Sequence, residues 1–390
     1  MLILPAICPD ETIYSLLARI ARINGKNHLE VVGFLLGDTH PTSVIGCPVN
    51  LEYFCEVTKR AFGSPNEILS HSTIFPMLAH LDLLSPSMLA KVENGNRRPE
   101  LGTLVFGMNK GCNWRICRKC IERDTKIYGI GYWHMTHQLP TSQYCTEHKL
   151  MLDSFELPRM NLHEHFILPN ELANKIKIDD VHSPIGSRQL SKDITMMGRD
   201  AFTDISKPYS KNIIQATFMA GLEQKTLLTD TGEVHMNRYK DRFEKNFDSD
   251  VSTTALLRQF KMSNSKQVLN GIANKFSSKP FNRLLLVYFL FDSWAAFKEQ
   301  SRWEEVMDLG SAMNGSAKSL DRSSMLSVEA MIQQQRVICV NYKISHIDPN
   351  RYEFMKKSYR AFRWLRQYDR KWLDEELPMQ VNKKGQGRLF

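Results

Sequence analysis

Residues 117–148 read CRKCIERDTKIYGIGYWHMTHQLPTSQYCTEH, and this stretch decides how the middle of the chain folds. It begins with Cys117-Arg-Lys-Cys120 and ends with Cys145-Thr-Glu-His148, and 24 residues separate these two motifs. In each motif a short turn can point both ligands at one centre, and three thiolates with one imidazole are a donor set that closes a tetrahedral zinc site. We therefore predict a Zn²⁺ ion bound by Cys117, Cys120, Cys145 and His148.

The predicted zinc site is structural rather than catalytic. With all four positions filled by protein ligands, no position remains for a reactive water molecule. Three other residues leave alternatives open. Cys112 lies five residues before Cys117 and could replace one ligand, while His134 and His137 lie between the two motifs and could compete for the ion.

The composition is that of an ordinary folded protein. The chain has 390 residues, of which 42% are hydrophobic and 24% charged, so two or three domains are expected. The apolar run 284–291 is far shorter than the roughly 20 residues that cross a bilayer, which excludes a membrane-spanning protein. The first residues do not resemble an export signal, so the eight cysteines indicate a reducing compartment, and we expect a cytoplasmic, nucleoid-associated bacterial protein.

The charge is basic and unevenly distributed. Lys and Arg total 51 against 42 acidic residues, a net charge of +9 that favours an anionic partner such as nucleic acid. Residues 351–390 hold 11 basic and 5 acidic residues, and residues 97–126 hold 8 basic and 3 acidic residues. The second of these regions overlaps the predicted zinc site.

The sequence predicts a mainly α, multi-domain protein in four parts. Residues 1–95 are expected to form a small N-terminal helical region, and residues 96–155 a zinc-ribbon or zinc-finger-like module. Residues 156–210 are polar and interrupted by prolines, so we expect a linker or irregular segment. Residues 211–390 are expected to form a basic, helical C-terminal domain that binds DNA or a larger complex.

Apolar periodicity and capping residues predict several individual helices. In ETIYSLLARIARI, residues 11–23, the apolar residues recur on one helical face, and Asp10 is the expected N-cap. A second helix over 29–36 should end at Gly37. Residues 301–325 are rich in Ser and Gly and are expected to form a loop, whereas 349–377 should form one long basic, aromatic helix.

Two segments of the C-terminal domain are candidates for nucleic-acid binding. If 351–373 is helical, its apolar residues form one stripe and five cations face outward, where they could contact phosphates: Lys356, Arg360, Arg363, Arg366 and Arg370. A core helix with a solvated basic face fits the same pattern. Residues 253–276 have the spacing of a helix-turn-helix, although any two-helix hairpin has it too.

Sequence signatures of common enzymes are absent. The chain has no GxxxxGK[ST], GxSxG, HExxH or GxGxxG motif, and no convincing pair of metal-binding carboxylates. We therefore expect a protein without catalytic activity. The remote alternative is a metal-dependent nuclease whose carboxylates converge only in the folded chain.

Several segments together resemble one protein family. They are PDETIYSLLARIAR at 9–22, HSTIFPML at 71–78, ICRKC at 116–120, YWH at 132–134 and YCTEHKLML at 144–152. In this order they resemble the TniQ family and, within it, the TnsD branch of target selectors from Tn-seven-type transposons. RAFRWLRQYDRKWLDEELP at 360–378 is similar to a TnsD pattern of two WL pairs with a charged spacer.

The resemblance implies a non-catalytic adaptor for DNA transposition. Members mark an insertion site and recruit an AAA+ ATPase regulator (TnsC-like) that brings the transposase. The TnsD branch reads target DNA directly, whereas the CRISPR-associated branch docks as a homodimer on an RNA-guided Cascade complex. The four zinc ligands transfer to this chain, with Trp133 and His134 as supporting residues. The chain lacks the second cysteine cluster after residue 150 that some CRISPR-associated members have. Longer TnsD proteins continue beyond the WL segment with more DNA-binding helices, so strong autonomous DNA reading is not expected.

Overall fold

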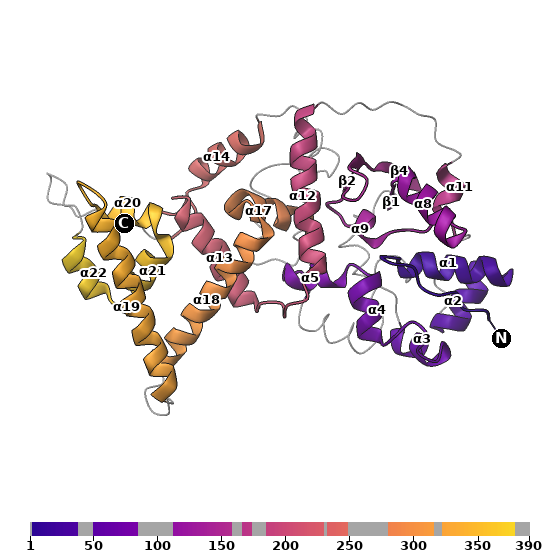
Figure 1. Cartoon of the computed structure of the whole chain (residues 1–390), viewed down its shortest axis with the longest axis horizontal. Helices are drawn as coiled ribbons and strands as arrows, with labels where there is room; N and C mark the ends of the chain where they lie inside the picture. Colours follow the sequence, from indigo (N-terminus) through magenta and orange to yellow (C-terminus); the bar gives the residue numbers. More distant parts are fainter. Residues whose placement is uncertain are drawn as a thin grey trace. The chain divides into compact units, whose positions relative to one another are not determined.

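The computed structural model describes residues 2–37, 50–84, 112–157, 166–173, 185–229, 232–248, 280–315 and 322–378. These residues are mainly helical, as the sequence predicts, and contain two small two-stranded sheets (Figure 1). The chain divides into two compact units: Met1–Tyr209 with Phe243–Phe289, and Ser210–Arg242 with Leu290–Phe390. The predicted helix-turn-helix at 253–276 lies outside the described residues. Among the described helices, none has the length and apolar character needed to cross a bilayer.

The N-terminal region consists of short helices, as predicted. They are α1 (Ile13–Asn24), α2 (His28–Leu36), α3 (Leu51–Val57), α4 (Pro65–Ser72) and α5 (Phe75–His80). Helices α2 and α4 each begin with a capping box, in which Asn27 or Ser64 exchanges hydrogen bonds with a glutamate three residues later. Helix α2 ends at Gly37, whose φ of 62° is left-handed, and this confirms the predicted end.

The N-cap of α1 differs from the prediction. Thr12 caps the helix, because its Oγ1 accepts a hydrogen bond from the backbone N–H of Ser15 at 3.1 Å. The prediction of Asp10 as the cap was therefore wrong. Asp10 has a left-handed φ of 61°, and its carboxylate accepts a hydrogen bond from the backbone N–H of Thr136 at 3.0 Å. The Asp10 side chain, which the sequence pattern assigned to the start of the helix, therefore bonds instead to a residue that is distant in the sequence.

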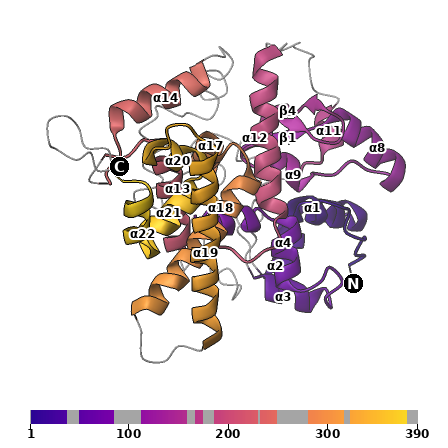
Figure 2. The same ribbon diagram turned by 60° about the vertical axis from the view of Figure 1, so that its left-hand side comes forward.

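The middle of the chain combines short strands with short helices. Its elements are β1 (Cys112–Ile116), α8 (Arg118–Tyr128), α9 (Met135–Gln138), β2 (Tyr144–Cys145), β3 (Leu150–Met151), β4 (Asp153–Leu157) and α11 (Pro169–Ala173). Strand β1 pairs antiparallel with β4, and β2 pairs antiparallel with β3. Figure 2 shows β1 and β4 next to each other, with α8, α9 and α11 in the same part of the chain.

The segment expected to be a linker or irregular, 156–210, contains the 19-residue helix α12 (Ile185–Thr203). Ile194, Met197 and Ala201 are buried along one side of this helix. Its polar residues include Thr195, whose Oγ1 donates to the carbonyl of Thr141 at 3.1 Å. Some polar residues of α12 therefore form hydrogen bonds with the preceding module. A search for apolar periodicity does not detect a helix that is held in this way.

The second unit is built on long helices. Within or partly within it lie α13 (Lys211–Gln224), α14 (Met236–Asp248), α17 (Pro280–Phe291), α18 (Trp294–Gly315) and α19 (Arg322–Ile344). Most of 301–325, expected to be a loop, is helical. Ser301 in α18 is fully buried and hydrogen-bonds to Thr217 of α13 at 3.1 Å. Packing of α18 on α13 therefore outweighs the weak helix preference of Ser and Gly.

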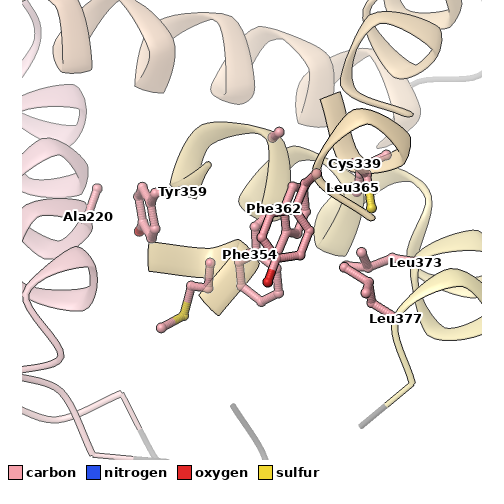
Figure 3. Close-up of a cluster of buried hydrophobic side chains, with 11 residues drawn as sticks. Ala220, Cys339, Phe354, Tyr359, Phe362, Leu365, Leu373 and Leu377 are labelled. Carbon is pink, nitrogen blue, oxygen red and sulfur yellow. The ribbon is translucent and has the colours of Figure 1, made fainter. Parts of the chain in front are cut away.

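The predicted single helix over 349–377 is wrong. The structure has three short helices instead: α20 (Arg351–Lys357), α21 (Tyr359–Tyr368) and α22 (Arg370–Glu376). The breaks are at Ser358 and Asp369, which leave helical geometry with ψ values of 50° and 44°. These breaks allow apolar residues of all three helices to pack in one cluster with Cys339 of α19 (Figure 3).

Candidate metal centre

The first two candidate ligands lie where β1 passes into α8. Strand β1 ends at Ile116, Cys117 is the N-cap residue of α8, and Cys120 lies in the first turn of that helix. The carbonyl of Cys117 accepts the helical hydrogen bond from the N–H of Ile121 at 3.1 Å. Both thiols are buried. A strand-to-helix junction therefore holds the two sulfur atoms of the CxxC motif together.

The other two candidate ligands come from the turn between β2 and β3. Cys145 pairs with Leu150, and its carbonyl accepts a hydrogen bond from the N–H of Lys149 at 2.8 Å. Lys149 has a left-handed φ of 55°, which reverses the chain. The N–H of His148 points to the sulfur of Cys145 at 3.4 Å. This turn therefore places an imidazole beside a thiol.

Strand β4 connects the two halves of the site. It follows the β2–β3 turn directly and pairs with β1 in a register that sets Asp153 opposite Ile116. The Arg118 guanidinium donates a hydrogen bond to Asp153 at 2.9 Å, which joins the start of α8 to the start of β4. Because β1 leads into Cys117 and β4 leads away from His148, their pairing brings both motifs together.

The four ligand atoms are close enough together to share one metal ion, and all lie within 4.8 Å of one another. Nδ1 of His148 lies 3.6, 3.2 and 3.6 Å from the sulfur atoms of Cys117, Cys120 and Cys145. The sulfur atoms of Cys120 and Cys145 are 3.7 Å apart. An S₃N tetrahedron with metal–sulfur bonds of about 2.3 Å has edges of about 3.6–3.8 Å. The cluster could therefore hold a metal ion.

The acid–base properties of the thiols also fit a cation at this position. Hydrogen bonding to Cys117 and Cys145 is the main cause that raises the pKa of Cys120 far above its ordinary value. Hydrogen bonds from Cys117 and Cys120 lower the pKa of Cys145 well below its ordinary value. The three thiols are therefore close enough for the charge of one to oppose the ionisation of another. A bound cation would stabilise all three thiolates.

Of the competing ligands, His134 lies outside this group, and the backbone of Cys112 begins the strand whose other end leads into Cys117. Cys112 is at the far end of β1, about 13 Å along the strand from Ile116. Nε2 of His134 lies 2.8 Å from the carboxylate of Asp124, and its Nδ1 lies 3.4 Å from that of Asp10. Burial opposes the charged imidazole, but these hydrogen bonds outweigh it and raise the pKa of His134 to about 9. His134 is therefore an ion-pair partner.

His137 lies next to the site without being one of the four grouped ligands. Its Nε2 is 3.9 Å from the sulfur of Cys120, and its side chain is buried. Desolvation is the main cause that lowers the pKa of His137 below its ordinary value.

A polar network extends from the metal-ligand turn into the N-terminal region. Glu147, between Cys145 and His148, pairs with Arg123 of α8, and Arg123 also pairs with Asp124 at 2.7 Å. Asp124 in turn accepts a hydrogen bond from His134. The sequence analysis did not identify Arg123, Asp124 or Glu147. In the sequence, the only sign of these ion pairs is that residues of opposite charge lie near the cysteines.

Trp133, expected to support the zinc module, joins that module to α1. Its carbonyl accepts a hydrogen bond from the N–H of Thr12 at 2.9 Å, and its N–H donates to Oγ of Ser15 at 3.1 Å. The Trp133 ring lies 4.5 Å from that of Trp114, which in turn lies 4.8 Å from the ring of Tyr14. The N-terminal motif and the YWH motif therefore form one buried junction.

The five cations proposed for nucleic-acid contact form ion pairs within the chain. Arg360 pairs with Glu299 and Arg363 with Glu304, and three further pairs are Arg366–Glu223 at 2.7 Å, Lys356–Glu353 at 3.3 Å and Arg370–Asp374 at 3.7 Å. The exposed fractions of the side chains differ widely, from 22% for Arg363 to 64% for Arg370. Arg363 is turned toward a buried glutamate, so the prediction that all five face outward is wrong for this residue.

Comparisons with known proteins identify the N-terminal part of the chain. Residues 2–152 match the family model described as TniQ, and no curated protein matches the chain significantly. The matched range includes α1, the YWH motif and all four grouped ligands. It therefore coincides with the part of the chain in which the N-terminal helices and the Cys₃His cluster share one core. Residues 2–152 of this chain are therefore similar to the TniQ family, which is associated with DNA transposition.

Proposed function

We propose that this chain is a non-catalytic target-site selector for a Tn-seven-type transposon. In this role it binds target DNA and recruits an AAA+ ATPase regulator (TnsC-like), which brings the transposase. The observation that carries the proposal is the TniQ match over residues 2–152, a range that includes the Cys₃His cluster and the helices attached to it.

We also propose that the metal is Zn²⁺ and that its role is structural. Three sulfur donors and one imidazole suit this ion, and protein atoms fill all four positions. The cluster connects a strand-to-helix junction with a hairpin turn. Binding free energies of about 10 kcal/mol or more in small zinc modules are sufficient to hold such segments together.

For DNA contact we propose a division among the five cations of 356–370. Lys356 and Arg370 have side chains that are 44% and 64% exposed, and we propose that they contact phosphates. Arg360, Arg363 and Arg366 pair with glutamates of α18 or α13, so we propose that these arginines hold α21 in place and add secondary contacts where they reach the surface.

A DNA-dependent assembly assay tests the adaptor role. The purified chain, the ATPase from the same element and target DNA are mixed, and complexes are separated by size. We expect the ATPase to join the complex only when both the chain and DNA are present. A lack of association over a range of DNA sequences and nucleotides would contradict the proposal. Cleavage of the DNA that required Mg²⁺ and a single carboxylate of this chain would instead support a nuclease.

One observation favours a second candidate function, docking as a homodimer on an RNA-guided Cascade complex. All five proposed DNA-contacting cations form ion pairs with carboxylates of the same chain, which reduces the positive charge available to phosphates. Footprinting separates the two candidates. Protection of a defined site in moderate salt supports direct reading, whereas weak binding at all sequences together with co-purification with Cascade supports docking.

A further inference from the structure

His137 lies against the metal centre in a fixed orientation. It belongs to α9, and its neighbour Gln138 is tied to β1 by two hydrogen bonds: the Arg115 N–H donates to Oε1 at 3.0 Å, and Nε2 donates to the Arg115 carbonyl at 2.7 Å. The imidazole of His137 packs against that of His134, with ring centroids 4.8 Å apart. The short helix therefore presents one buried imidazole edge to the cysteine cluster.

The chemistry of the contact determines which group donates. Nε2 of His137 lies 3.9 Å from the sulfur of Cys120, with both side chains buried. A thiolate that binds a metal has no hydrogen and can only accept. The imidazole nitrogen that faces it must therefore carry the hydrogen. His137 also lies outside the group whose ligand atoms are all within 4.8 Å of one another.

We propose that His137 is a positioning residue of the metal centre, which donates a hydrogen bond from Nε2 to the thiolate of Cys120 without binding the ion. The hydrogen bond withdraws charge from sulfur, so the bound thiolate reacts more slowly with electrophiles and the ion is held more tightly. This inference rests on the proposed structural zinc site.

Two substitutions separate hydrogen bonding from packing. His137→Gln keeps an N–H donor at nearly the same position, whereas His137→Leu keeps the volume and removes the donor. The zinc-loaded full chain is treated with iodoacetamide, and in parallel with a chromogenic zinc chelator. We expect His137→Leu to be alkylated and to release zinc about 10-fold faster than the unaltered chain, and His137→Gln to stay near the unaltered rate. Equal rates in all three proteins, or the same acceleration in both variants, would overturn the proposal.

A second measurement uses the chain without substitutions, so its result does not depend on whether the variants fold. The chain is labelled with ¹⁵N in its histidines and loaded with ¹¹³Cd²⁺ in place of zinc. We expect one buried histidine with its hydrogen on Nε2 and a scalar coupling from that hydrogen to cadmium through sulfur. A hydrogen on Nδ1, or direct coupling of the His137 nitrogen to cadmium, would overturn the proposal. If the chain binds no metal, both the zinc proposal and the role of His137 are overturned. If the chain binds a full equivalent of metal and the variants are alkylated and release zinc at the unaltered rate, only the role of His137 is overturned.

Discussion

Nε2 of His134 lies 2.8 Å from Oδ2 of Asp124, a carboxylate whose side chain has no exposure to solvent. The same imidazole lies 3.4 Å from Asp10, which precedes α1. A positive charge on His134 therefore connects α8 of the metal module with the N-terminal helices. An ion pair of this kind loses its stabilising effect when the imidazole loses its proton.

The charge of His134 predicts a pH dependence of stability. Its pKa is raised from 6.5 to about 9 on folding, so the folded state binds the proton more tightly. The resulting stabilisation is fully present below pH 6.5 and is lost as the pH rises toward 9. A shift of this size corresponds to about 3 kcal/mol. We expect the urea-unfolding free energy of the zinc-loaded chain to fall by up to this amount over that range.

The control for this prediction is His134→Gln, which keeps hydrogen bonding and removes the titration. The free energy of unfolding is measured for both proteins with zinc in excess, and the difference between them is compared across pH. We expect the difference to shrink as the pH rises. A difference that stays constant from pH 6 to 9.5 would show that folding does not raise the pKa of His134.

Removing one sulfur ligand should abolish metal binding. For Cys120→Ser we expect metal content well below one equivalent and a large loss of thermal stability, because the remaining three ligands leave an incomplete tetrahedron. Cys55→Ser is the matched control, since Cys55 is also a fully buried free cysteine but lies in α3 outside the cluster. Elemental analysis and thermal unfolding measure both effects. A full equivalent of zinc in the Cys120 variant would contradict the ligand assignment.

Arg363 should contribute to the stability of the C-terminal region, whereas Arg370 should contribute to DNA binding. Arg363→Gln leaves Glu304 buried without its cation, which should lower the free energy of unfolding by about 3 kcal/mol, with part of the loss offset by the hydrogen bond from Gln300. Arg370→Gln should leave stability unchanged and reduce the salt dependence of DNA binding by about one phosphate contact. Denaturation and salt titrations measure the two effects. Equal destabilisation by both variants would contradict this division.

Two helical glycines should respond differently to alanine. A Cβ at Gly198 would lie 1.9 Å from Oγ1 of the buried Thr141, whereas a Cβ at Gly33 would meet nothing within 4 Å. Gly198→Ala should therefore destabilise the chain by about 1–3 kcal/mol, because α12 must move away from the metal module. Gly33→Ala should be neutral or stabilising by up to about 1 kcal/mol. Thermal unfolding that shows no difference between them would contradict close packing at Gly198.

Local sequence signals were sufficient for parts of the fold and the site. The grouped ligands were predicted because a CxxC motif and a CxxH motif each specify their geometry within four residues, and the structure places those four ligand atoms together. Helix α2 ends at Gly37 as expected, since a glycine cap depends only on the residues at the end of the helix. Such features depend only on neighbours along the chain.

Other features depended on contacts between distant residues. Asp10 bonds to Thr136 rather than capping α1, and Arg363 turns inward because Glu304 of α18 is buried beside it. The basic segment breaks at Ser358 and Asp369 so that its apolar residues reach Cys339. Periodicity showed which residues were apolar or charged but could not show what they would face.

The amino-acid sequence by itself therefore determined the candidate ligand set, the helical character and the TniQ resemblance, because these follow from residue types at fixed short spacings. Only the tertiary structure decided that His134 is held between Asp10 and Asp124, that His137 faces the cysteines, and that Arg363 pairs internally. The physical reason is that charge pairing and hydrogen bonding act over a few ångströms in space, and the chain brings such partners together only when it folds.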